Sequence, residues 1–158
     1  MGTGFLSASY GPVSYDEMIA NIAAFIREDT NYNYELIVGT DSEARGNAAD
    51  FVSAVVVHRR GKGGIYFWQK ENLKNVYVMA DRIAKETQFS IELAWKLRDT
   101  FHHNGLSGIE PEVHLDVGEK GLTRDMIKWV TGMVLGSGFR YKIKPDSYGA
   151  TKVADRHT

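Results

Sequence analysis

Residues 34–42, with the sequence YELIVGTDS, decide the fold that we expect: an apolar, β-branched run that closes on Asp41. A second short run, residues 112–116 (EVHLD), closes on Asp116. A carboxylate at the tip of a buried strand is costly unless a positive charge meets it, and two on neighbouring strands repel each other unless a cation lies between them. The pair therefore points to metal-dependent phosphate chemistry.

The composition is that of an ordinary globular chain, with 158 residues of which 43% are hydrophobic and 25% charged. This length buries one core and is short for two, so we expect residues 1–158 to form a single domain. The net charge of -1 and the pI near 6.5 argue against a protein that grips nucleic acid by bulk positive charge. A local basic patch stays open.

The sequence holds no cysteine, which excludes a disulfide framework, a thiolate zinc site and a cysteine nucleophile. A reducing cytoplasm fits this composition, and we expect a cytoplasmic protein. The N-terminus shows no basic region followed by an apolar run, and no stretch approaches the roughly 20 apolar residues of a membrane span. We therefore expect neither export nor a membrane partner.

A helix followed by three strands is predicted for the first half of the chain. Ser14 and Glu17 have the spacing of a capping box, which predicts a helix over residues 14–29. The β-branched and aromatic runs that follow predict strands ending near residues 41, 57 and 68, with a polar loop at 42–50. Because the connections are short and the second is rich in glycine, all three strands are expected to be antiparallel neighbours.

The second half alternates helices and strands. The predicted elements are a helical stretch over 76–103, either one helix or two joined near residue 87, a strand at 112–116, a helix over 123–135, a strand at 139–144 and a last helical turn over 148–156. Strands separated by helices usually run parallel through right-handed crossovers. The strand that closes on Asp116 is therefore expected beside and parallel to the one that closes on Asp41, with both acids at one edge of the sheet.

This order of elements resembles the ribonuclease H fold: an α/β fold with a five-stranded mixed sheet, in which a three-strand antiparallel meander is joined by two parallel strands, with helices on both faces. The resemblance implies a glutamate on the helix after the third strand, often in a Thr-x-x-x-x-Glu pattern. Thr87 and Glu92 have that spacing, and Glu86 on the same helical segment is the alternative. A fourth ligand usually comes from a C-terminal helix, where Asp155 is the candidate and His157 the alternative.

A narrower resemblance covers nearly the whole chain from about Val13. The strings VGTDS at 38–42, DVG at 116–118, GLT at 121–123 and KPDSYGAT at 144–151, followed by ADR at 154–156, are similar to those of the YkuK-type bacterial proteins. Those proteins are classed as predicted ribonuclease H-like nucleases. The resemblance therefore implies a nuclease of bacterial type.

The function predicted from these residues is two-metal hydrolysis of phosphodiester bonds in RNA, DNA or a hybrid. Hard oxygen ligands suit Mg²⁺ or Mn²⁺, which gives Asp41, Glu92, Asp116 and Asp155 the roles of catalytic residues and metal ligands. The resemblance implies products with a 5′-phosphate and a 3′-hydroxyl. Each acid also has an ordinary interpretation, because aspartate caps turns, helix glutamates are often solvated, and chain ends fray.

Other residues and functions stay open. Lys142, Lys144, Lys152 and Arg156 are candidates to contact phosphates or to balance the acids, with a solvated strand edge and helix end as the competing interpretation. The alternative function is a non-catalytic module that retains the fold and binds nucleic acid or protein. Residues 116–121 have the Asp-x-Gly-x-x-Gly form of the phosphate loops of actin-like ATPases, but 158 residues supply only one of the two lobes that such enzymes need.

Overall fold

The computed structural model describes residues 4–106, 108–118, 122–147 and 149–158. Residues 119–121 of the ATPase-like loop and residue 148, where the last helical turn was predicted to begin, lie outside the described residues. The elements in chain order are β1 (Gly4–Phe5), β2 (Val13–Ser14), α1 (Tyr15–Glu28), β3 (Tyr34–Arg45), β4 (Ala48–Arg59), β5 (Gly64–Lys74), α2 (Met79–His103), β6 (Pro111–His114), α3 (Arg124–Gly136), β7 (Arg140–Lys142) and α4 (Gly149–His157).

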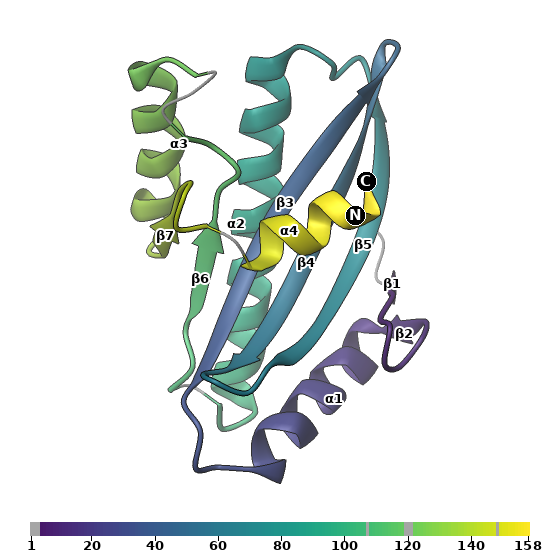
Figure 1. Ribbon diagram of the computed structural model, residues 1–158, viewed down its shortest axis with the longest axis vertical. Helices are drawn as coiled ribbons and strands as arrows, with labels where there is room; N and C mark the ends of the chain where they lie inside the picture. The colour runs from purple at the N-terminus through teal and green to yellow at the C-terminus, as the bar shows by residue number, and fades with distance from the viewer. Residues whose placement is uncertain (1–3, 107, 119–121, 148) are drawn as a thin grey trace.

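The main sheet has five strands in the order β5-β4-β3-β6-β7 (Figure 1). Strands β3, β4 and β5 form an antiparallel meander, and β6 and β7 run parallel to β3 on its other side. The predicted mixed sheet is therefore confirmed. A small two-stranded sheet of β1 and β2 was not predicted, because each strand is only two residues long.

The loop predicted at residues 42–50 is wrong. Strand β3 continues past Asp41 to Arg45, and its register with β4 holds from Tyr34 to that residue. The connection is the two-residue turn Gly46–Asn47, in which the positive φ of 64° at the glycine suits a tight hairpin. The polar run after Asp41 is thus the solvent-facing end of a long hairpin, and Asp41 lies within a strand.

The predicted helices are confirmed. The capping box closes the start of α1, where Glu17 N–H donates to Ser14 Oγ at 3.1 Å and Ser14 N–H donates to Glu17 Oε1 at 3.0 Å. Helix α2 is one continuous helix of 25 residues and has no break near Thr87. In the part of the chain that the structure describes, no helix combines the length and the apolar character needed to cross a membrane.

Helices cover both faces of the sheet (Figure 1). Buried residues of α1, α2 and α3 share one hydrophobic core with the side chains that β3, β4 and β5 turn to that face. Helix α4 lies across the opposite face, where Ala150 and Ala154 pack with Ile37 and Ala54. Its close approach depends on Gly39, because a Cβ there would lie 2.9 Å from the Cβ of Ala150. Small residues thus let α4 bring its side chains to the middle of β3.

Candidate functional site

Two aspartates meet where β3 and β6 part. The parallel register pairs Gly39 with His114, the last residue of β6. Asp41 and Asp116 each follow two residues beyond that pair, so they emerge at the same level of the sheet. The predicted pairing of these two strands is confirmed, and it brings the two carboxyl groups within interaction distance.

The surroundings of Asp41 disfavour its negative charge. Only 8% of the residue is exposed. Burial is the largest cause that raises the pKa of Asp41 to about 7, and the neighbouring carboxyl groups of Asp116 and Asp155 contribute next. A carboxyl group that shares its site with like charges holds a proton near neutral pH unless a cation joins the group. Asp41 is thus the centre of an acidic cluster.

Helix α2 contributes Glu86 to this cluster. The residue is 7% exposed, and burial is the largest cause that raises its pKa to about 8. The charges of Asp41 and Asp116 raise it as well, which places Glu86 beside the two aspartates. A hollow of about 190 Å³ opens here, which we call the acid hollow; among its lining residues are Asp41, Arg82, Glu86, Asp116 and Lys144.

Hydrogen bonds from β3 and α2 hold the Glu86 side chain in place. Ser42 Oγ donates to Glu86 Oε2 at 2.5 Å. Arg82, one helical turn before Glu86, donates from Nε to Ser42 Oγ and from Nη2 to the Ser42 carbonyl, both at 3.1 Å. Since its hydroxyl hydrogen goes to Glu86 and its oxygen accepts from Arg82, Ser42 fixes the carboxylate relative to the strand that carries Asp41.

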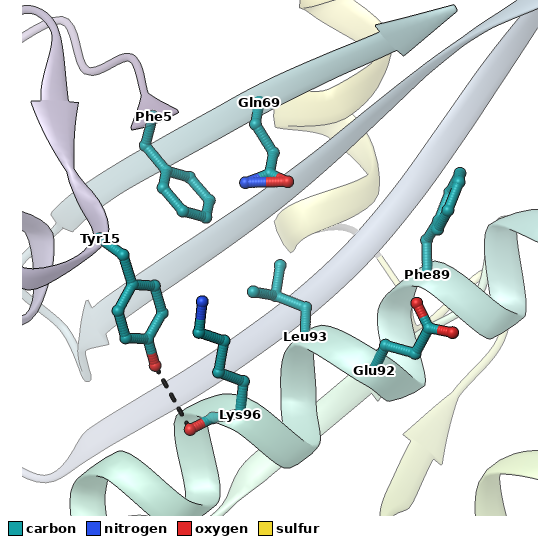
Figure 2. A pocket seen from close by; sticks show the side chains of 7 residues that line it. All are labelled: Phe5, Tyr15, Gln69, Phe89, Glu92, Leu93 and Lys96. Atoms are coloured by element: carbon teal, nitrogen blue, oxygen red, sulfur yellow. Dashed lines mark hydrogen bonds between the residues drawn. The ribbon is translucent and has the colours of Figure 1, made fainter. Parts of the chain in front are cut away.

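Glu92 lies elsewhere. Six positions further along an α-helix, a side chain points about 120° away around the axis. Glu92 is exposed, and its Oε1 accepts a hydrogen bond from Gln88 Nε2 at 2.9 Å. It lines a separate hollow of about 130 Å³ between α2, β5 and the N-terminal segment, which we call the α1 hollow and which Figure 2 shows with Phe5, Tyr15 and Lys96 among its walls. The structure therefore brings Glu86, the alternative, to Asp41, and does not bring Glu92.

The C-terminal helix places its two candidates differently. Asp155 is exposed on α4 and close enough to Asp41 to raise the pKa of that residue. It lines a third hollow of about 410 Å³, which we call the α4 hollow. Asp116 and Lys144 line both this hollow and the acid hollow, and Lys152 lines the α4 hollow alone. His157 instead stacks on Trp68, with ring centroids 3.7 Å apart and planes 7° from parallel. Of these two, only Asp155 joins the acidic cluster.

A lysine already neutralises part of the cluster. Lys144 Nζ lies 2.6 Å from Asp116 Oδ1. Within the described ranges, no three Asp, Glu, His or Cys side chains converge closely enough to form a ready-made metal site. The available donors are nevertheless carboxylate oxygens, which are the ligands that Mg²⁺ and Mn²⁺ prefer. The pKa values of Asp41 and Glu86 are raised first by burial and then by repulsion between the carboxyl groups, and a cation would offset both. The donor set fits these ions.

A five-stranded mixed sheet in which a meander is joined by two parallel strands, with helices on both faces, is the architecture of the ribonuclease H-like class of folds. A family model described as Ribonuclease H-like matches residues 17–158, and the chain belongs to this family. It is 32% identical, over an alignment of 166 residues, to the protein named "Uncharacterized protein YkuK" of Bacillus subtilis (strain 168); the alignment covers 98% of this chain and 96% of that protein. The predicted resemblance is confirmed.

Solved ribonuclease H structures are more distant. The crystal structure of RNase H1 from the halophilic archaeon Halobacterium salinarum NRC-1 has 14% identity and a TM-score of 0.46, covering 77% of this chain and 92% of that one. The structure of LC11-RNase H1 in complex with an RNA/DNA hybrid has 14% identity and a TM-score of 0.43, covering 77% and 95%.

Ser42 and Arg82, which hold the Glu86 side chain, were not predicted as neighbours of the acidic cluster. The sequence held one signal for each: Ser42 follows Asp41 directly, and Arg82 precedes Glu86 by four positions, which puts both side chains on one face of a helix. Their roles become visible only once β3 extends past Asp41 and faces α2.

Proposed function

We propose that this protein is a divalent-metal-dependent nuclease that hydrolyses phosphodiester bonds in RNA, DNA or a hybrid of the two. The observation that carries the proposal is that Asp41 has carboxyl groups from three other segments around it: Asp116 and Asp155 raise its pKa, and it raises the pKa of Glu86 in turn. Carboxyl groups held close together repel each other, which is unfavourable for folding. Groups with pKa values perturbed in this way are found mainly at functional sites.

The carboxylates of Asp41, Glu86, Asp116 and Asp155 would hold Mg²⁺ or Mn²⁺. When bound there, such ions would supply activation of a water for in-line attack on the phosphate and charge stabilisation of the departing oxygen. Glu86 takes the role that the Thr-x-x-x-x-Glu spacing assigned to Glu92, because Glu86 is the buried glutamate beside Asp41. Ser42 and Arg82 orient it through their hydrogen bonds.

Positive side chains around the cluster suit a phosphate substrate. Arg82 lines the acid hollow, Lys152 lines the α4 hollow and Lys144 lines both. Cations on either side of the acids would hold a phosphodiester backbone against its repulsion by the carboxylates. This distribution supports a polyanionic substrate that crosses both hollows.

Cleavage assays with Mn²⁺ on labelled single-stranded RNA, single-stranded DNA, their duplexes and a hybrid test the proposal. We expect products with 5′-phosphates from at least one substrate, and loss of cleavage in the Asp41→Asn, Asp116→Asn double variant. A wild-type protein that is inert on all substrates would rule the nuclease out. Salt-sensitive nucleic-acid binding that survives the double substitution in such an inert protein would favour the non-catalytic module instead.

A further inference from the structure

Lys144 pairs with Asp116, one of the acids proposed to hold the metal ions. Its ammonium group lies 2.6 Å from Asp116 Oδ1, and the residue lines both the acid hollow and the α4 hollow. The fields of Asp41 and Asp155 also act on it, after that of Asp116. One positive charge therefore faces three of the four carboxyl groups of the proposed site.

The backbone directs Lys144 to this position. Leu115 N–H donates to the Lys142 carbonyl at 2.9 Å, and Lys144 N–H donates to the Val117 carbonyl at 2.8 Å. These bonds continue the parallel pairing of β6 and β7 beyond the strands, up to the residues that flank Asp116. Gly118 leaves room for the lysine stem, because a Cβ at that position would lie 3.1 Å from Lys144 Cβ.

The side chain is nevertheless free to leave. It is 57% exposed, whereas that of Asp116 is 24% exposed. An ammonium group on a flexible four-carbon stem is a movable point charge, and a single exposed ion pair holds it weakly. Arg82 is different, since two hydrogen bonds tie its guanidinium group to Ser42.

We propose that Lys144 is an internal counterion, which neutralises Asp116 in the metal-free protein and is displaced when a divalent cation binds the acidic cluster. This inference rests on one part of the proposed function, the binding of a divalent cation by the acidic cluster. It does not require that the protein cleaves nucleic acid. Displacement leaves the ammonium group tethered at the rim shared by the two hollows, where a phosphate of the substrate is the next available anion.

Calorimetric titration of Mn²⁺ into wild type and the Lys144→Met variant tests this exchange. Methionine keeps the length of the stem and removes the competing charge, so the dissociation constant should fall by roughly two- to fivefold, the equivalent of a surface ion pair. Lys142→Met is the matched control: it removes the same charge from the same strand region, but Lys142 pairs with Glu112 at 3.7 Å. We expect it to bind Mn²⁺ as wild type does.

Two results would overturn the proposal: Lys144→Met binding Mn²⁺ no more tightly than wild type, or no Mn²⁺ binding by any of the three proteins. A crystal structure soaked in Mn²⁺ adds a direct check, because Lys144 Nζ must then lie beyond hydrogen-bonding distance of Asp116. If Lys144→Met folds poorly, Lys144→Gln takes its place. The two proposals can fail separately. If the wild-type protein cleaves no substrate but Lys144→Met still binds Mn²⁺ more tightly than wild type, the counterion proposal holds and the nuclease proposal fails.

Discussion

Two glutamates of one helix, Glu86 and Glu92, stand in opposite surroundings. Glu86 is 7% exposed, receives a hydrogen bond from Ser42 and shares its hollow with Asp41 and Asp116. Glu92 is exposed and bonds only to Gln88 of its own helix among the hydrogen bonds described for it. The two residues differ in burial and in the charges nearby, and the spacing from a threonine reveals neither property.

The acid hollow and the α1 hollow, which these two glutamates line, differ in the same way. The acid hollow brings together Asp41 and Glu86, whose pKa values are raised, and places Arg82 and Lys144 beside them. The α1 hollow has aromatic walls, and its ammonium group, that of Lys96, lies 4.0 Å from the centre of the Tyr15 ring (Figure 2). The acid hollow thus holds charges that disfavour folding. The α1 hollow is a packing seam, by which we mean the line of contact between the N-terminal segment and α2.

The largest expected effect comes from exchanging the two glutamates. Glu86→Gln should lower kcat/KM by at least about a hundredfold, since even residues that only orient metal ligands contribute about 10- to 100-fold. Glu92→Gln should stay within about twofold, as expected for a solvated residue outside the site. Steady-state cleavage with Mn²⁺ measures both, after thermal unfolding has shown that both variants are folded. The opposite ranking would return the role to Glu92.

The structure gives a physical reason why the Thr-x-x-x-x-Glu spacing pointed away from the acidic cluster. The Thr-x-x-x-x-Glu pattern is informative where the threonine opens the helix, but α2 begins at Met79 and Thr87 lies inside it. There its hydroxyl donates to the Ile83 carbonyl at 2.9 Å, as threonines within helices often do. The sequence placed the start of the helical stretch near residue 76 but left a break near residue 87 open, so a second helix that opened at the threonine was still possible.

Other parts of the fold were accessible from the sequence. The order of elements and the handedness of crossovers were enough to place β6 beside β3, and hence Asp116 beside Asp41. The length of β3 was underestimated because its end is polar, although the Gly46–Asn47 pair is a hairpin signal. The pairing of Lys144 with Asp116 depends on backbone bonds between two segments beyond the ends of β6 and β7, which no sequence pattern announces.

The second-largest expected effect is the pH dependence of stability, which the acidic residues of the acid hollow should cause and the α1 hollow should not. Asp41 and Glu86 have pKa values of about 7 and 8 in the folded chain, against roughly 4 in an unfolded one. The folded state therefore binds more protons between these values, and the free energy of unfolding of the metal-free protein should fall as pH rises from about 4 to 8. Acidic conditions favour the fold over this range, and alkaline conditions remove that advantage.

Asp41→Asn should reduce this fall, because it removes one acid and the repulsion that it exerts on Glu86. At pH 8.5 we expect the variant to be more stable than wild type by about 1–3 kcal/mol, and near pH 4 to match it. Urea denaturation in the presence of a chelator, at several pH values, measures the difference. Glu92→Gln is the control and should retain the wild-type pH dependence; identical curves for Asp41→Asn and wild type would show that the acids do not repel each other.

The smallest effect is expected in the α1 hollow. Tyr15 Oη lies 2.7 Å from Thr100 Oγ1 and donates to the Lys96 carbonyl at 3.3 Å, which ties the start of α1 to α2. Tyr15→Phe removes these bonds and keeps the ring, so urea denaturation should report a loss of about 0.5–1.5 kcal/mol. Cleavage and Mn²⁺ affinity should not change, because no carboxyl group of the acidic cluster lines this hollow. A loss of activity comparable to that of Glu86→Gln would mean that the two hollows are coupled through α2 and that the α1 hollow is more than a packing seam.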